Sequence, residues 1–473
     1  MTYLPNHRNI LSAKLVTYRA LRKWMAGVFF ALCTFTGLEA APAADHTPNF
    51  ILVLTDDQSW VGTSLQMLKD HPETRSDFYN TPQVERLAAK GMRFTQGYAP
   101  AASCCPTRRA IQTGLMPARH EYHRNRSQWT DWYRQQLNIP RMLKIANPRY
   151  ECAHFGKWDH RYDQISPHQQ GYDHSDGTTG NAHGGAKGSG GPAASPDPKR
   201  VDTLTDQALH FMQRNHAQKS PFFLQISHYA VHLDIYYREE TLAQIRKRPL
   251  GTKHPTPTFA AMTEDLDTSI GRIVDLMDAL NLWNNTYLIL MSDNGGRNTL
   301  PGTPPPTIPR NHPLRDGKHS FYEGGIRVPF IVAGPQIKAN SVSHVPITGL
   351  DILPTLADLA GYPLPLPKTL DGGSLSSLLK TEGLGQVTRN RPYLVFHQAV
   401  DRRPTSAIRW GAFKLVKHWE TAKLELFNLR EDLSENRDLS TTMPERTKRM
   451  EEVLLQCLEE VGAETRRTVR KRP

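Results

Sequence analysis

Two pairs of oxygen-bearing side chains follow apolar runs at widely separated places in the chain. Asp56 and Asp57 come directly after the run 49–55 (NFILVLT), and Asp293 and Asn294 come just after the run 287–291. Both runs are continuous, which predicts strands buried on both faces of a sheet. Carboxylate and amide oxygens are hard ligands that suit Ca²⁺ or Mg²⁺. An Asp-Asp pair alone is more often a cap or a turn, so the metal hypothesis depends on the chemistry found beside it.

A cysteine-containing segment supplies that chemistry. Positions 104–108 read CCPTR, and a Thr-Gly pair follows at 113–114. Such a segment could be a buried turn with two inert thiols, but its spacing resembles the signature of the type I sulfatases of the alkaline phosphatase superfamily. In that family a separate maturation enzyme oxidises the first cysteine to formylglycine. Proline two residues on and arginine four residues on select Cys104 over Cys105, and the arginine is Arg108.

Three further stretches resemble the same family and carry cationic side chains. Positions 156–158 (GKW) contain a lysine that contacts sulfate in the family, positions 227–232 end in a sulfate-binding histidine, and positions 317–329 contain a substrate-contacting lysine before YEGGIRVP. Cationic groups suit this role because they offset charge on a transferring sulfuryl group. The resemblance implies that Arg108, which supports the formylglycine, is catalytic together with Lys157, His232 and Lys318. Arg327 is expected to organise structure. The resemblance also implies a calcium ion, or a magnesium ion, bound by Asp56, Asp57, Cys104, Asp293 and Asn294.

One position departs from the family pattern. The family usually has a histidine after GKW that helps to hold the formylglycine hydroxyl, whereas this chain has Asp159 followed by His160. Either His160 takes that role through a small backbone shift, or Asp159 does different work. A carboxylate would repel the sulfate unless a metal or a lysine screened it. We therefore expect Asp159 to point away from the sulfur position and His160 to be the inner residue.

The resemblance implies a sulfatase that hydrolyses sulfate esters through the formylglycine made from Cys104. The formal net charge of +12 falls to about +8 without the first 44 residues, which contribute +4, and a basic balance suits an anionic partner. We expect sulfated polysaccharides or oligosaccharides as substrates and no nucleic-acid partner. The alternatives are a phosphate or phosphonate ester hydrolase of the same superfamily and a catalytically silent protein that binds sulfated glycans.

The elements that must position these residues form an α/β pattern. Buried strands are predicted at 49–55, 222–226, 287–291 and 329–333, and helices at 82–90, capped by Thr81, and at 262–280. Alternating strands and helices predict a largely parallel sheet, whose ligands bind beyond the carboxyl ends of the strands. The resemblance adds that this fold is alkaline-phosphatase-like, with a large mixed, mostly parallel sheet flanked by helices. Positions 175–198 and 300–313 are expected to be irregular loops.

The two ends of the chain predict its organisation. Basic residues, an apolar run at 25–38 and small residues up to 44 indicate a signal peptide at 1–44, with an uncleaved membrane anchor as the alternative. A catalytic domain at 45–395 and a C-terminal antiparallel α+β subdomain with a basic tail at 396–473 should follow. We expect export to the periplasm or the medium and no stable membrane span after signal removal. The five cysteines form no disulfide framework, although a Cys105–Cys152 bridge is left open.

Overall fold

A computed structural model of the chain describes residues 47–120, 126–160, 165–185, 191–303, 305–399 and 404–465. All of these residues belong to one structural unit, Thr47–Pro473. The predicted signal peptide and the basic tail at 466–473 lie outside the described residues. Within the described part of the chain, no helix has both the length and the apolar character that crossing a bilayer requires.

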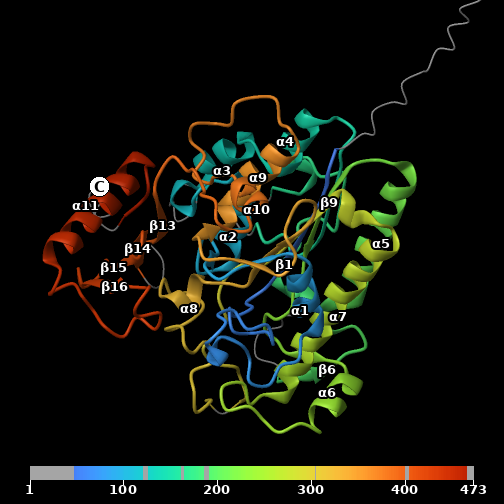
Figure 1. Cartoon of the computed structure of the whole chain (residues 1–473), viewed down its shortest axis with the longest axis horizontal. Coiled ribbons are helices and arrows are strands. Elements are labelled where there is room, and N and C mark those ends of the chain that lie inside the picture. The colour runs from blue at the N-terminus through green and yellow to red at the C-terminus, as the bar shows by residue number, and fades with distance from the viewer. Residues whose placement is uncertain are drawn as a thin grey trace, which may run out of the picture. The chain divides into compact units, whose positions relative to one another are not determined.

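The central sheet has eight strands in the order β11-β2-β10-β9-β1-β7-β4-β5. Figure 1 labels β1 and β9. β10 is antiparallel to both of its neighbours, and the other pairs are parallel. The prediction of a mixed, mostly parallel sheet is therefore confirmed. The strands are β1 (Asn49–Thr55), β2 (Met92–Phe94), β4 (Glu151–Gly156), β5 (His174–Ser175), β7 (Phe222–Ser227), β9 (Thr286–Ser292), β10 (Phe330–Ala333) and β11 (Ser341–Ser343).

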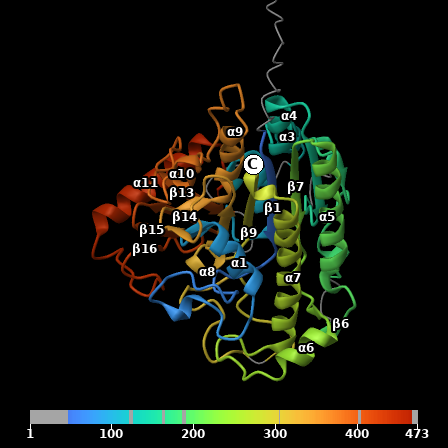
Figure 2. The same cartoon turned by 45° about the vertical axis from the view of Figure 1, so that its right-hand side comes forward.

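Both faces of this sheet are covered, which explains why β1 and β9 are buried along their whole length. Alternate β1 residues point to opposite faces, so Ile51 packs in one core cluster and Leu52 in the other. The Ile51 cluster includes residues of α1 (Pro82–Lys90), α5 (Val201–Gln218) and α7 (Pro257–Ala279), and Figure 2 shows α5 beside α7. The Leu52 cluster includes residues of α2 (Cys104–Thr113), α4 (Ile139–Ala146), α9 (Ile352–Leu359) and α10 (Ser376–Lys380).

Helix α1 occupies the predicted residues but is capped differently. The side chain of Thr81 makes no capping hydrogen bond, and its Oγ1 instead accepts one from Ser64 N at 2.8 Å. The carboxylate of Asp267 in α7 accepts hydrogen bonds from Gln83 N and Val84 N, both at 2.9 Å. Thr81 is therefore the N-cap residue, as predicted, but its side chain does not cap the helix, because a residue distant in the sequence satisfies the first amide groups.

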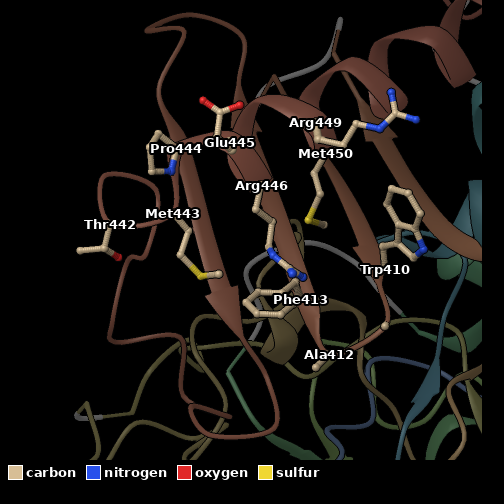
Figure 3. Close-up of a pocket in the computed structure, with 11 residues that line it drawn as sticks. Trp410, Ala412, Phe413, Thr442, Met443, Pro444, Glu445, Arg446, Arg449 and Met450 are labelled. Carbon is tan, nitrogen blue, oxygen red and sulfur yellow. The ribbon is translucent and has the colours of Figure 1, made fainter.

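The C-terminal subdomain is a four-stranded antiparallel sheet packed against α11 (Pro444–Glu460). Its strands are β13 (Tyr393–Gln398), β14 (Thr405–Trp410), β15 (Phe413–His418) and β16 (Leu424–Asn428). The boundary predicted at 396 thus falls inside β13. A cavity of about 870 Å³ lies between the β14–β15 turn and α11 (Figure 3). There the guanidinium of Arg446 lies 4.0 Å from the centre of the Phe413 ring.

The remaining elements are short. They are α3 (Arg126–Gln135), α6 (Glu239–Ile245), α8 (Glu323–Ile326), β3 (Gly97–Tyr98), β6 (Ala193–Ala194), β8 (Tyr236–Tyr237) and β12 (Ile347–Thr348). The segment predicted as a loop at 175–198 contains β6, which pairs with β8, so part of it is ordered. Cys105 and Cys152 are both buried, and no disulfide joins them.

Candidate active site

Four strand ends meet at one edge of the central sheet. Because β1, β4, β7 and β9 are parallel, the residues that follow them lie at the same edge. The side chains gathered there are almost completely buried, apart from the partly exposed His232. They are Asp56 and Asp57 after β1, Lys157 after β4, His232 after β7, and Asp293 and Asn294 after β9, joined by Arg108 from α2 and Lys318.

Asp57 is the centre of one half of this cluster. Asn294 Nδ2 donates to Asp57 Oδ1 at 2.8 Å, the ammonium group of Lys318 pairs with the same oxygen, and His232 Nε2 lies 3.8 Å from Asp57 Oδ2. Burial alone would raise the pKa of Asp57, but Lys318 and His232 hold that pKa well below its ordinary value. Asp57 is therefore ionised at neutral pH.

Arg108 and Lys157 form the other half. Lys157 Nζ donates to Asp56 Oδ2 at 2.6 Å, and Arg108 Nε donates to Asp293 Oδ2 at 2.9 Å. Arg108 also donates to the backbone carbonyl of Lys157 at 2.5 Å, which ties α2 to the end of β4. Burial alone would lower the pKa of Lys157, but Asp56 raises it above its ordinary value. Two fixed positive charges therefore lie beside the carboxylates.

Three oxygens of the cluster are suited to a hard cation. Among the described residues, Asp56 Oδ1, Asp57 Oδ2 and Asn294 Oδ1 are buried and accept no hydrogen bond. Ligand atoms of Asp56, Asp57 and His232 lie within 4.8 Å of one another. Carboxylate and amide oxygens are the ligands that Ca²⁺ prefers. Asp293 differs, because its Oδ1 accepts from Asp57 N at 3.2 Å and its Oδ2 accepts from Arg108.

Cys104 is the first residue of α2 and is buried. Burial and the charge of Asp159 raise the pKa of its thiol to about 11, against the opposing effect of Lys157 and Lys318. The thiol is therefore protonated at neutral pH, and an unmodified Cys104 is a poor nucleophile. Lys157, Lys318 and the carboxylate of Asp159 all lie close enough to act on this position.

Comparison with known proteins identifies the family. A family model described as sulfatase matches residues 48–362, and one described as N-sulphoglucosamine sulphohydrolase, C-terminal, matches residues 311–463. The chain belongs to the sulfatase family. This sulfatase is a sulfuric ester hydrolase with the fold of the alkaline phosphatase superfamily, as the sequence predicted.

Individual relatives cover most of the sulfatase. A sulfatase of Formosa agariphila is 27% identical, with 85% of this chain and 86% of the relative aligned. The N-acetylgalactosamine-6-sulfatase of Mus musculus is 28% identical over 76% of this chain and 70% of its own length. The structure of Ps i-CgsB in complex with k-i-k-neocarrahexaose has a TM-score of 0.68 and 22% identity, and the match covers 87% of this chain and 93% of that one.

The structure corrects the expectation for Asp159. Its Oδ2 lies 3.7 Å from Lys157 Nζ, and its charge acts on Cys104. The prediction that Asp159 points away from the site is therefore wrong. The reason is the left-handed backbone of Asp159, with φ 58°, held by its N–H, which donates to Thr179 O at 2.8 Å. Lys157 lies between Asp159 and Asp56, and so screens the carboxylate.

His160 lies in an aromatic layer of the sulfatase. Its ring stacks on the indole of Trp158, with centroids 4.2 Å apart and planes 17° apart, and its centroid is 5.8 Å from that of Tyr133. Of Asp159 and His160, Asp159 is therefore the one that lies beside Lys157 and acts on Cys104. An acid or base role for His160 stays a prediction.

Lys199 is a residue of the site region that sequence reasoning missed. It is buried, and its ammonium lies 5.2 Å from the centre of the Tyr236 ring. Burial lowers the pKa of Lys199 to about 8, while Asp56 and Asp234 act in the opposite direction. No motif surrounds this lysine, which follows a Gly-, Ala- and Pro-rich stretch. Only the tertiary fold brings it near Asp56.

Proposed function

We propose that this sulfatase hydrolyses sulfate esters of polysaccharides or oligosaccharides, using a formylglycine made from Cys104 and a bound Ca²⁺ or Mg²⁺. The observation that carries the proposal is that α2, which begins at Cys104, also brings Arg108 into contact with Asp293 and with the carbonyl of Lys157 at the edge of the sheet. Hydrated formylglycine would supply two hydroxyl groups, one to attack sulfur and one to expel the sulfate in the second step.

The described side chains fit the needs of that chemistry. Asp56, Asp57 and Asn294 would hold the cation, which would polarise the sulfate and orient the attacking hydroxyl. Lys157 and Lys318 offset charge on the sulfate oxygens. Arg108, fixed by Asp293 and by the carbonyl of Lys157, supports the residue at position 104.

His232 and Asp159 are suited to moving protons. His232 lies at the partly exposed side of the cluster, and burial lowers its pKa below its ordinary value. It can therefore bind a sulfate oxygen or stand beside the leaving alcohol. The carboxylate of Asp159 is an acceptor, so it can take a proton from the hydroxyl that expels the sulfate.

The net charge of the chain and its relatives support a proposal for the substrate class and for the cellular location. A relative is named N-acetylgalactosamine-6-sulfatase and a similar structure holds D-glucosamine-2-N, 6-O-disulfate, and the formal net charge of the chain without its first 44 residues is about +8. A basic surface favours an anionic glycan over small neutral sulfate esters. We further propose that the chain is exported by its N-terminal signal to the periplasm or the medium, and that a formylglycine-generating enzyme matures it.

A substrate panel tests the proposal. The matured protein is assayed against sulfated mono- and oligosaccharides, an aryl sulfate, and phosphate and phosphonate esters. We expect kcat/KM for the best sulfated saccharide to exceed that for any phosphorus ester by about a hundredfold or more. Faster turnover of a phosphonate or phosphate ester would instead favour the related hydrolase. Glycan binding without turnover by protein that carries formylglycine would favour a silent binding protein.

Replacement of Asp159 and of His160 separates their roles. Asp159→Asn keeps the shape of the side chain but removes the proton acceptor, so kcat should fall by about a hundredfold or more. His160→Ala removes a ring that stacks on Trp158, so kcat should fall by less than about tenfold. Steady-state kinetics of both variants on one sulfated saccharide measure this. A larger loss of kcat in His160→Ala than in Asp159→Asn would indicate that His160 transfers the proton.

A further inference from the structure

A second polar cleft lies between the catalytic domain and the C-terminal sheet. It has a volume of about 720 Å³ and is lined by residues that follow β2 and β11, by residues around β13 and β14, and by residues that follow β16. We call it the Arg409 cleft. None of its lining residues belongs to the cluster around Cys104.

The sheet topology places this cleft on the catalytic edge. β2 is parallel to β11 and antiparallel to β10, and β10 is antiparallel to β9. The carboxyl ends of β2 and β11 therefore lie at the same edge as those of β1 and β9. β2 is the third strand from β1, which corresponds to about 14 Å across the sheet at the usual strand spacing. An extended polymeric ligand bound at one site can therefore reach the other site along that edge of the sheet.

The lining of the cleft is strongly basic. Its only acidic residue is Glu431. Two of its arginines have carboxylate partners, since Arg327 pairs with Glu323 at 3.2 Å and Arg389 with Asp351 at 2.5 Å. The basic lining residues are His71, Arg327, His344, Arg389, Arg409 and Arg430.

Arg409 of β14 differs from these two paired arginines. It is only 5% exposed, it donates to Gln96 Oε1 at 2.5 Å, and its guanidinium lies 5.3 Å from the centre of the Tyr98 ring. Its Nε and NH1 groups are buried and have no hydrogen-bond partner in the described part of the chain. Glu323 acts on Arg409 through its charge, but it accepts no hydrogen bond from these two groups. Buried N–H donors without an acceptor are costly, so an anion brought into the cleft would gain unused donors.

We propose that the Arg409 cleft binds a second sulfate group of the glycan whose first sulfate lies at Cys104. The inference rests on the proposed function, because it takes a sulfated oligosaccharide as the ligand. The guanidinium group suits a sulfate because it remains charged and presents several N–H donors to anionic oxygens. The cleft would therefore select substrates that carry sulfate on more than one residue.

Binding without turnover tests this proposal. In the Cys104→Ala background, the affinity of a dextran sulfate hexasaccharide is measured by calorimetry for four proteins. The first is the Cys104→Ala protein itself. The other three each carry one additional substitution: Arg409→Gln, Arg430→Glu or Arg449→Gln. Arg430 is an exposed residue of the cleft, so its replacement leaves the core intact. Arg449 is the matched control, because it is an exposed arginine on α11 that lines the neighbouring cavity of Figure 3 and not the Arg409 cleft.

We expect Arg409→Gln to weaken hexasaccharide binding by about tenfold or more, and Arg430→Glu by about threefold or more. Arg449→Gln should change it by less than about twofold. Both cleft variants should keep the aryl sulfate kcat and KM of the matured enzyme. Hexasaccharide affinities within twofold for both cleft variants would overturn the cleft proposal, whether or not sulfate esters are hydrolysed. Loss of affinity in a protein that hydrolyses no sulfate ester would support the cleft and overturn the proposed function instead.

Discussion

Replacing Cys104 with alanine is expected to abolish sulfate ester hydrolysis and to leave the fold nearly intact. Loss of a nucleophile lowers kcat by about 10⁴-fold or more in hydrolases that depend on one. The substitution removes only a sulfur atom from the start of α2, so the free energy of unfolding should fall by no more than about 2 kcal/mol. Activity of the matured protein and thermal unfolding measure the two effects.

Peptide mass analysis accompanies this experiment. Coexpression with a formylglycine-generating enzyme should replace the thiol of Cys104 with an aldehyde, detected as loss of sulfur and as reaction with a hydrazide. Cys105→Ala is the control, because Cys105 is also buried in α2, and it should still be converted and active. Conversion at Cys105 in the wild-type chain would contradict the assignment of Cys104.

Removal of the metal is expected to abolish activity as well. A chelator should leave Asp56, Asp57 and Asn294 with three unpartnered oxygens, and added Ca²⁺ should restore turnover. At a Ca²⁺ concentration about a hundredfold above Kd, binding should stabilise the fold by about 2.7 kcal/mol. Elemental analysis and thermal unfolding with and without Ca²⁺ are readouts that need no turnover.

Asp57→Ala should lose both the bound metal and the stabilisation by Ca²⁺. Asp275→Asn is the control, because Asp275 is an exposed carboxylate on α7 whose partner is Arg86, and it should keep both. Full activity of chelated protein that contains no metal would exclude a metal-dependent site at Asp57.

Much of the scaffold was predictable because its signals are local. The run 49–55 is apolar from 50 to 54, which favours a strand covered on both faces, and Asp56 and Asp57 follow it at the ligand-binding edge. The helix 82–90 is bounded by Pro82 and Gly91, and both bounds are observed. The motif at 104–108 specified the family, and with it the residues that the structure gathers around Cys104.

The wrong predictions concern positions whose local structure depends on the tertiary fold. Thr81 has the right type and place for a cap, but Asp267 supplies the capping interaction from another helix. Asp159 enters the site because its own φ is positive. Lys199 and Arg409 belong to no motif, and only their burial in the folded chain distinguishes them from other basic residues.

The burial of Cys104 bears on the order in which this residue can be modified and α2 can pack. Its side chain is 3% exposed, and every residue of α2 is buried. An enzyme that oxidises this thiol must therefore reach it while α2 is still unpacked from the sheet. Under the proposed maturation, oxidation of Cys104 and folding of α2 would compete in the nascent chain, and a molecule that folds first would keep an unmodified cysteine. The yield of active enzyme would depend on how slowly this segment folds, and not only on how much protein is made.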